Sequence, residues 1–370
     1  MGADITVVGG GFIGLSFSMA AAQQGFSVEV YDRKSRPAEP GTFSSNVLAI
    51  NSASRAFLAS IGAWDSIPDR FRAAYKAMSV VDGSGTGSVR FTAEEAGLPE
   101  LGCIVDQPAL LAALADCAES ADNLVVHWQS EVDIDVGVSP LVVGADGVHS
   151  ALREKLGLKK ISFAYGQTAT VCVAEVERPH DACARQWFLE KGPLAFLPLG
   201  DEHRVAVVWS SFDELEDLDE DVFIDALYEA SEGALGAIVG IGKRFGFPLR
   251  QQQALQYVAE GVALMGDAAH AIHPLAGQGA NLGFADARVL SDELIAARIE
   301  GRSPGNLTVL KRYERVRRPE NHLTALAMEG FHRLFTARFP WASVLRGQGM
   351  HFFGSSEILK RLAIGAASGR

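Results

Sequence analysis

Residues 5–33, ITVVGGGFIGLSFSMAAAQQGFSVEVYDR, decide the fold. The stretch begins with four β-branched residues, passes through a Gly-x-Gly-x-x-Gly pattern, and continues with apolar residues at near-helical spacing. Gly25 ends this apolar segment, and a second strand-like run closes on Asp32. The order predicts a strand, a tight turn, a helix and a second strand.

Each glycine of this turn has its own physical reason. Gly9 permits the tight turn, Gly11 lets a phosphate approach the backbone, and Gly14 lets the helix pack closely on the strand. The helix N-terminus offers unpaired N–H groups and the positive end of its dipole to that phosphate. Asp32 can accept hydrogen bonds from a ribose diol. The unit therefore predicts a dinucleotide site, although the motif alone does not choose between NAD and FAD.

A second glycine-acid cluster, LVVGADGVHSALR, starts at Leu141. An apolar strand leads into a turn made by Gly144, Asp146 and Gly147, and Ser150 can cap a helix that begins near residue 151. An ordinary joint between a strand and a helix is the alternative for this segment taken alone.

The third cluster, GVALMGDAAHAIHPLAGQGANLGFADA, spans residues 261–287. A strand over 262–265 leads into Gly266 and Asp267, whose carboxylate can bind a polyol chain. The loop Gly277–Gly279 then brings bare peptide groups to the start of a second helix, expected from about Ala280. Because glycine has no Cβ, such a loop can approach a flat ring at its edge.

Composition narrows the class of protein further. The chain has 370 residues, 48% of them hydrophobic, which is enough for two domains. Its net charge of −12 argues against a nucleic-acid partner. Four scattered cysteines without a CxxC pair predict reduced thiols in the cytoplasm. We expect no signal peptide and no membrane-spanning segment, because no apolar run reaches about 18 residues.

His270 and His273 are the residues most compatible with a metal site. They lie three positions apart, and Asp267 lies three positions before the first of them. The segment between and after them consists of loop formers, and no further ligand pattern is visible. We therefore expect no metal, and turn or capping histidines are the alternative.

The three clusters, in this order, resemble those of FAD-dependent aromatic hydroxylases with the para-hydroxybenzoate-hydroxylase fold. HPLAGQGANLGFAD, residues 273–286, is similar to the signature of the ubiquinone-biosynthesis hydroxylases, the UbiH/UbiF/VisC group. ARQWFLEKGPLAFLPL (184–199), YERVRRPEN (313–321) and LKRLAIG near the end also resemble this family. The resemblance extends over essentially the whole chain.

The resemblance implies an α/β fold with a discontinuous, Rossmann-like FAD-binding domain over residues 1–74, 101–160 and 259–310. It implies a sheet-based α+β substrate domain over 75–100 and 161–258, followed by a C-terminal helical region over 311–370. It also assigns site residues. Those near the reactive ring are Pro274, Gly277, Gln278 and Gly279. Those expected to bind the cofactor are Gly9, Gly11, Gly14, Asp32, Arg33, Gln107, Asp146, Gly147, Gly266, Asp267, Ala280 and Asn281.

One segment departs from the family pattern. Many members have Asp-x-Arg-x-x-Ala-Leu after the second strand, where this chain has SSNVLAI, with Ser44 and Asn46 in place of the acid and the arginine. That arginine usually helps with cofactor phosphates or with flavin movement. Arg33 and Arg36 are the candidates to compensate for its loss.

The resemblance implies a monooxygenase that holds FAD non-covalently, takes electrons from NAD(P)H, and hydroxylates an aromatic ring with O₂ through a flavin C4a-hydroperoxide. An apolar pocket lined by Phe196, Leu197 and Trp209 would suit a prenylated phenol, although for each residue taken singly a plain core position is the stronger interpretation. A hydroxylase of a small soluble aromatic compound and a non-catalytic flavoprotein subunit remain alternatives. The C-terminal helices could contact a membrane surface or a partner in a biosynthetic complex.

Overall fold

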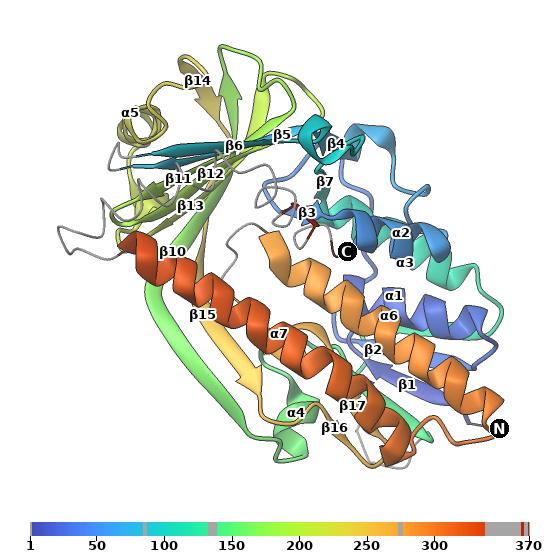
Figure 1. Cartoon of the computed structure of the whole chain (residues 1–370). Coiled ribbons are helices and arrows are strands. Elements are labelled where there is room, and N and C mark those ends of the chain that lie inside the picture. The colour runs from blue at the N-terminus through green and yellow to red at the C-terminus, as the bar shows by residue number, and fades with distance from the viewer. Residues whose placement is uncertain are drawn as a thin grey trace.

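The computed structural model describes residues 2–83, 87–131, 139–272 and 277–336, together with Ile364, Gly365 and Gly369. Within these residues the chain forms a six-stranded, a nine-stranded and a three-stranded sheet, with helices packed around them (Figure 1). The predicted α/β class, in which a Rossmann-like unit is followed by a second sheet, is confirmed. The domain boundaries themselves stay a prediction.

The six-stranded sheet has the order β16-β17-β9-β1-β2-β8. All neighbours are parallel except β16, which pairs with β17 in the antiparallel sense. Parallel strands covered on both faces are apolar throughout, and Ile5, Val7 and Val143 are fully buried. The strands are β1 (Ile5–Val8), β2 (Val28–Asp32), β8 (Leu124–Trp128), β9 (Leu141–Gly144), β16 (Val258–Ala259) and β17 (Val262–Leu264).

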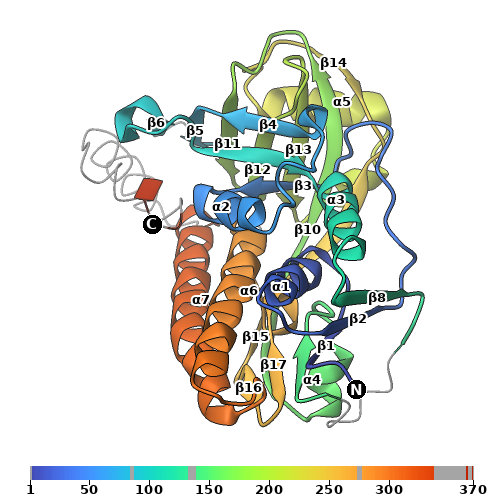
Figure 2. The ribbon, with the colours of Figure 1, turned by 90° about the vertical axis from the view of Figure 1, so that its right-hand side faces the viewer.

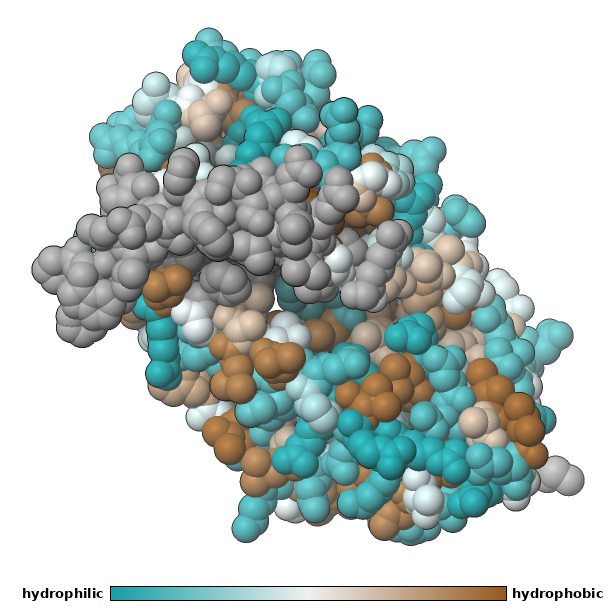
Figure 3. Space-filling model, viewed as in Figure 1, coloured by the Kyte–Doolittle hydropathy of each residue, from teal (hydrophilic) through white to brown (hydrophobic). Residues whose placement is uncertain are grey.

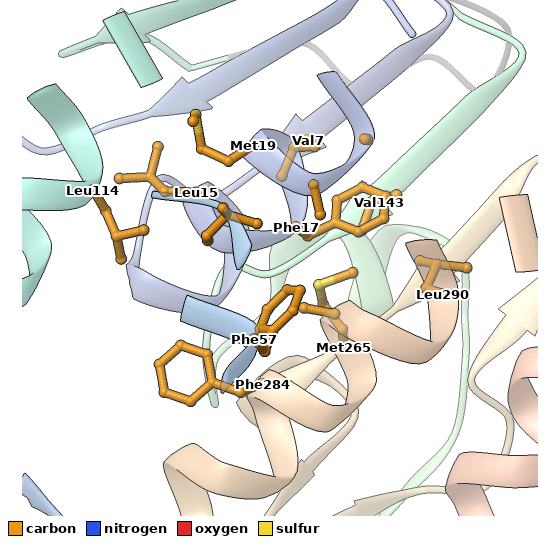
Figure 4. Close-up of a cluster of buried hydrophobic side chains, with 14 of the residues drawn as sticks. Val7, Leu15, Phe17, Met19, Phe57, Leu114, Val143, Met265, Phe284 and Leu290 are labelled. Carbon is orange, nitrogen blue, oxygen red and sulfur yellow. The ribbon is translucent and has the colours of Figure 1, made fainter. Parts of the chain in front are cut away.

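Helices pack against this sheet and against one another. α1 (Phe12–Gln23) packs between α3 (Gln107–Glu119) and α6 (Gln278–Ile299), and α6 packs on α7 (Leu307–Thr336), as Figure 2 shows. The core formed where these elements meet is drawn in Figure 4, which shows buried side chains from α1, α3 and α6, among them Phe17, Leu114 and Phe284. The strands and helix that open the chain are therefore where the first glycine pattern predicts them.

The nine-stranded sheet follows the order β18-β15-β10-β13-β12-β11-β5-β6, and β14 also pairs with β10. Helix α5 (Glu220–Ala230) covers one of its faces. Within the predicted substrate domain, β10 and β13 pair in the antiparallel sense. The strands are β5 (Ala77–Asp82), β6 (Ser88–Thr92), β10 (Lys160–Val176), β11 (Cys183–Leu189), β12 (Gly192–Pro198), β13 (Arg204–Ser211), β14 (Ile238–Ile241), β15 (Phe245–Ala254) and β18 (His270–Ala271).

Two connections tie the sheets together. The long pair β10 and β15 runs from the nine-stranded sheet beside α7 (Figure 1), and the chain passes from β17 to β18, and so from one sheet to the other, within a few residues. The remaining elements are β3 (Val47–Ile50), β4 (Arg72–Tyr75), β7 (Gly102–Asp106), α2 (Ser52–Ser60), α4 (Ala151–Lys155) and the 3-10 turns η1 (Asp69–Phe71), η2 (Glu94–Ala96), η3 (Leu215–Asp217) and η4 (Gly266–Ala268).

Candidate cofactor site

A cavity of about 680 Å³ opens at the carboxyl ends of β1, β2, β9 and β17. This edge of a parallel sheet is where doubly wound folds bind ligands. The cavity is lined by residues from all three glycine-acid clusters, which are far apart in the sequence. The predicted site residues on its wall are Gly9, Gly11, Asp32, Arg33, Gln107, Asp146, Gly147, Gly266, Asp267, Gly277, Gly279 and Ala280.

The three N-terminal glycines are constrained in different ways. Gly9 has φ +107°, and a Cβ on it would lie 2.4 Å from the Ala145 carbonyl oxygen. A Cβ on Gly14 would lie 2.0 Å from the Gly9 carbonyl oxygen, so Gly14 serves helix packing and does not line the cavity. A Cβ on Gly11 would meet no atom within 4 Å. The fold would therefore accommodate a side chain at Gly11, and its absence leaves free space in the cavity.

Two helices direct their N-termini at this cavity. α1 has Gly11 as its N-cap and α6 has Gly277, and glycine carries no side chain to cap the first turn. By contrast, α2, α3 and α4 are capped by the side chains of Asn51, Asp106 and Ser150. The predicted Ser150 cap is thus confirmed. Two helix N-termini without side-chain caps on the lining of the cavity favour negative charge within it.

Asp32 and Asp146 fix the turns that form the cavity wall. Asp32 accepts hydrogen bonds from the backbone N–H groups of Gly10 and Lys34, both at 2.7 Å. Asp146 Oδ2 accepts one from the Ala151 N–H at 2.7 Å. Asp146 Oδ1 is buried and has no hydrogen-bond partner among the described residues. A buried acceptor without a partner is rare, so this oxygen is open to a donor from a bound group.

Asp267 faces the cavity from η4. Its side chain is exposed to the cavity space but surrounded by protein atoms, and the resulting desolvation raises the pKa of its carboxyl, while the nearby His270 lowers it. An anionic carboxylate here is costly, and a hydroxyl donor would lower that cost. This environment fits the polyol contact predicted for Asp267.

The loop that leads into α6 lies at the other end of the cavity. Gly277 has φ +63°, and a Cβ on it would lie 2.8 Å from the Cβ of Ala49, whereas a Cβ on Gly279 would face open space. Helix α6 starts at Gln278, two residues before its predicted start, and Gln278 does not line the cavity. Pro274 and His273 lie outside the described residues.

Asn281 has a different role from the predicted one. Its side chain is buried, donates to the Ala49 carbonyl at 2.8 Å, and accepts from the Asn51 N–H at 3.0 Å. The amide therefore ties α6 to the end of β3 and the start of α2 instead of lining the cavity. The assignment of Asn281 as a cofactor ligand is corrected: both ends of its amide are used within the protein.

We expect Asn281→Ala to lower the free energy of unfolding by about 1 to 3 kcal/mol, because two buried backbone groups lose their partner. The affinity of the folded variant for FAD should stay within about threefold of wild type. Thermal unfolding and FAD titration of the same sample measure the two effects separately. A large loss of FAD affinity at unchanged stability would contradict this structural role.

The family arginine absent at Asn46 has one candidate substitute on the cavity wall. Arg33 is exposed and lines the cavity. Arg36 is not available for this purpose, because its guanidinium pairs with Asp116 at 2.5 Å and with Glu119 at 3.0 Å on α3. Of the two compensating arginines considered from the sequence, the structure brings only Arg33 to the site.

A buried polar network below the cavity was not predicted. Asp286 on α6 is fully buried and lies 2.5 Å from His270 Nε2 and 2.8 Å from Arg317 Nε on α7. It also accepts from the Gly266 N–H and from Asn321, at 3.0 and 3.1 Å. The network joins η4, β18, α6 and α7. The signal in the sequence was a single aspartate between the apolar residues Phe284 and Leu290 of the predicted helix.

Electrostatics keep Asp286 ionised. Burial alone would raise the pKa of its carboxyl, but the attraction and hydrogen bonds of His270 and Arg317 outweigh burial and lower the pKa to about 2. In this structure His270 Nε2 is thus engaged by Asp286. Within the described ranges no cluster of three metal-ligating side chains exists.

The predicted substrate residues divide between the two faces of the nine-stranded sheet. Phe196 and Trp209 are buried against α5 in the same cluster as Trp187 and Phe223, and Trp187 and Phe196 have ring centroids 5.1 Å apart. This packing corrects the prediction for both residues, because they are core residues on the face away from the cavity. Leu197 lies on the opposite face and packs near residues 47 and 49, which line the cavity.

Comparisons with known proteins agree with this geometry. Residues 138–325 match the FAD binding domain family, and residues 7–60 match an NAD(P)-binding Rossmann-like domain. The chain is 31% identical to 3-demethoxyubiquinol 3-hydroxylase of Escherichia coli, over 99% of this chain and 98% of that protein. It is 33% identical to ubiquinone hydroxylase UbiL of Rhodospirillum rubrum, over 99% and 90%.

Among solved structures, p-nitrophenol 4-monooxygenase PnpA from Pseudomonas putida superposes with a TM-score of 0.78 at 19% identity. The match covers 100% of this chain and 98% of that one. At this identity the likeness shows a shared fold.

Proposed function

The chain belongs to the FAD-dependent hydroxylase family of ubiquinone biosynthesis, and from this premise we propose that it hydroxylates the ring of a prenylated phenol. It is an FAD-dependent monooxygenase, with NAD(P)H and O₂ as co-substrates. The observation that carries the proposal is the cavity where two glycine-capped helices and three predicted carboxylates meet. The full-length similarity to two ubiquinone hydroxylases supports the substrate class.

We propose that the dinucleotide lies along this cavity. The first turn of α1 would hold the pyrophosphate, Asp32 the adenosine ribose, and Asp146 and Asp267 the polyol chain. FAD supplies the redox chemistry when bound, which the side chains of this chain lack. The N–H groups at the start of α6 would stabilise negative charge at the reacting end and orient the ring.

The substrate class is supported by the apolar surface next to the α6 end of the cavity. Leu197 on β12 is half-buried and packs with Val47 and Ala49, which belong to the cavity wall. A ring placed between this surface and the flavin would meet methyl groups rather than charges. An isoprenoid chain gains from such a surface, because each buried CH₂ contributes about 0.8 kcal/mol.

The discriminating measurement compares two phenols that differ only in a short isoprenoid chain. We expect NAD(P)H oxidation to be stimulated by both and kcat/KM to be at least about tenfold higher with the chain, since burial of five carbons exceeds the 1.4 kcal/mol of one decade. Product mass spectrometry measures the hydroxylated ring. Equal kcat/KM for the two phenols, or turnover of a small benzoate alone, would contradict the proposed substrate.

Genetic complementation tests the proposed substrate class in a cell. Strains blocked at each ring hydroxylation of quinone synthesis would receive this gene, and their quinone intermediates would be identified by mass spectrometry. Restoration at one step assigns the ring position. Restoration at none would leave the hydroxylase of a soluble aromatic compound as the better proposal.

We propose further that the enzyme works in the cytoplasm and contacts a membrane or a biosynthetic complex through its C-terminal region. No helix among the described residues has the length and apolarity needed to cross a bilayer. Of the C-terminal helical region predicted over 311–370, the part beyond residue 336 lies almost wholly outside the described part of the chain. The first half of α7 is described and carries five basic residues, Lys311, Arg312, Arg315, Arg317 and Arg318.

A further inference from the structure

A second cavity, of about 790 Å³, lies between α7 and the pair β10 and β15. It shares no lining residue with the cavity proposed for FAD. Its apolar wall comes from the start of β10 and the end of β15, where Ile161 is 64% exposed, Phe163 55% and the adjoining Leu255 37%. We call this cavity, which is lined by residues of α7, of β10 and of the segment 251–255, the α7 groove. Side chains this apolar and this exposed on neighbouring positions are unusual without a partner.

The opposite wall of the α7 groove is basic. Lys311 lies 3.9 Å from Glu314, and Arg333 lies 2.5 Å from Glu329. Arg315 and Arg318, one turn apart, are exposed and have no ion pair or hydrogen bond to another described side chain. Like charges at this spacing on a helix repel each other, and an anion bound between the two arginines would relieve that repulsion.

The positive charge of the α7 groove contrasts with the composition of the whole chain. The protein carries a net charge of −12, yet the four cations of this wall are gathered on one helix face. The two acids of the groove, Glu314 and Glu329, are already engaged: Glu314 accepts from the Tyr257 N–H at 2.7 Å, and Glu329 pairs with Arg333. The uncompensated charge of the α7 groove is therefore positive.

Apolar side chains continue along the outer side of α7. Leu323 is 69% exposed, Leu326 54% and Val316 39%. Figure 3, which views the molecule from the α7 side, shows hydrophobic residues interspersed with hydrophilic ones over this face. A helix that presents exposed leucines together with arginines that lack an ion pair within the described ranges has the composition of a segment that lies at a membrane interface.

We propose that the α7 groove docks the protein on an anionic phospholipid bilayer. A lipid phosphate would lie between Arg315 and Arg318, and its acyl chain would lie along Ile161, Phe163 and Leu255. The groove's volume is in the range of sites that enclose a small-molecule ligand. This inference deepens the proposed function, because it places the enzyme at the surface that holds prenylated substrates. Its evidence is separate from that for FAD binding.

The test uses the full-length, FAD-loaded protein and sedimentation with vesicles. Vesicles of phosphatidylcholine alone are compared with vesicles containing phosphatidylglycerol. We expect binding to the anionic vesicles only. Arg315→Gln with Arg318→Gln should weaken it about 30-fold, since each cation near such a surface contributes about fivefold. Phe163→Ser should weaken it by a similar factor through the lost apolar contact.

The matched control is Arg178→Gln with Arg204→Gln, which removes the same charge from exposed positions outside the groove. Its binding should stay within about twofold of wild type. The FAD spectrum, the melting temperature and turnover of a soluble phenol without vesicles should be unchanged in all variants, so that failure of docking is distinguished from failure of the proposed function. Binding lost equally in the control, or kept in the groove variants, would overturn the proposal. Failure of wild type to bind anionic vesicles would also overturn it, and would favour an acidic protein partner.

Discussion

Gly11→Asp should lower the affinity for FAD by at least about 100-fold while leaving the folded protein intact. Gly11 is the N-cap of α1 with φ −72° and ψ 176°, a conformation open to any residue, and a Cβ there meets nothing within 4 Å. Aspartate is a preferred N-cap, so the free energy of unfolding of the apoprotein should stay within about 1 kcal/mol of wild type. The new carboxylate would occupy the wall where a pyrophosphate is proposed to bind.

Gly11→Asn is the matched control. Asparagine has the same size and caps equally well but carries no charge, so it should weaken FAD binding by only about tenfold, through the space it fills. Equilibrium titration of the apoproteins with FAD measures both. Equal losses for Asp and Asn would mean that the cavity next to Gly11 does not hold an anionic group.

Gly14→Ala provides a contrast within the same motif. Its Cβ would lie 2.0 Å from the Gly9 carbonyl oxygen, so the backbone must move. We expect loss of the fold rather than loss of FAD alone, with a destabilisation of about 3 kcal/mol or more. Recovery of folded Gly14→Ala at wild-type stability would contradict the packing role of this glycine.

What the sequence could predict was local. The first strand, the glycine turn and the first helix lie within thirty residues of one another. Hydrophobic periodicity indicates the strand and the helix, and glycine's conformational freedom at positions such as Gly9 indicates the turn. The cavity could be anticipated because the carboxyl ends of parallel strands meet at one edge of a sheet. Most predicted cofactor residues accordingly line it.

The sequence could not predict which face of a strand points toward the cavity, or which buried side chains of distant segments meet. In β12 both faces are apolar, with Leu194 and Phe196 on one and Ala195 and Leu197 on the other, so alternation did not reveal which face meets the cavity. The Asp286 network is brought together from three separate segments. No local pattern encodes a pairing between β18, α6 and α7.

Asp286→Asn should lower the free energy of unfolding by about 3 to 5 kcal/mol at neutral pH, the second large effect we expect. The substitution leaves Arg317, which is nearly fully buried, with the exposed Glu320 as its remaining carboxylate partner, and it replaces the anion beside His270 with a neutral amide. Asp292→Asn on the same helix is the control. That residue is exposed and pairs with Arg288 at 3.4 Å, so its loss should cost less than about 1 kcal/mol.

The pH dependence distinguishes an ionised Asp286 from a merely well-packed one. Its pKa is about 2 in the folded protein, below its ordinary value of 3.8. A group with a depressed pKa stabilises the fold above its unfolded pKa, and that contribution is lost as the pH falls toward the folded value. The stability gap between wild type and Asp286→Asn should therefore narrow as the pH falls from about 5 to 3. Urea unfolding of both proteins across this range measures the gap. A gap that does not change with pH would show that the carboxylate does not stabilise the network as an anion.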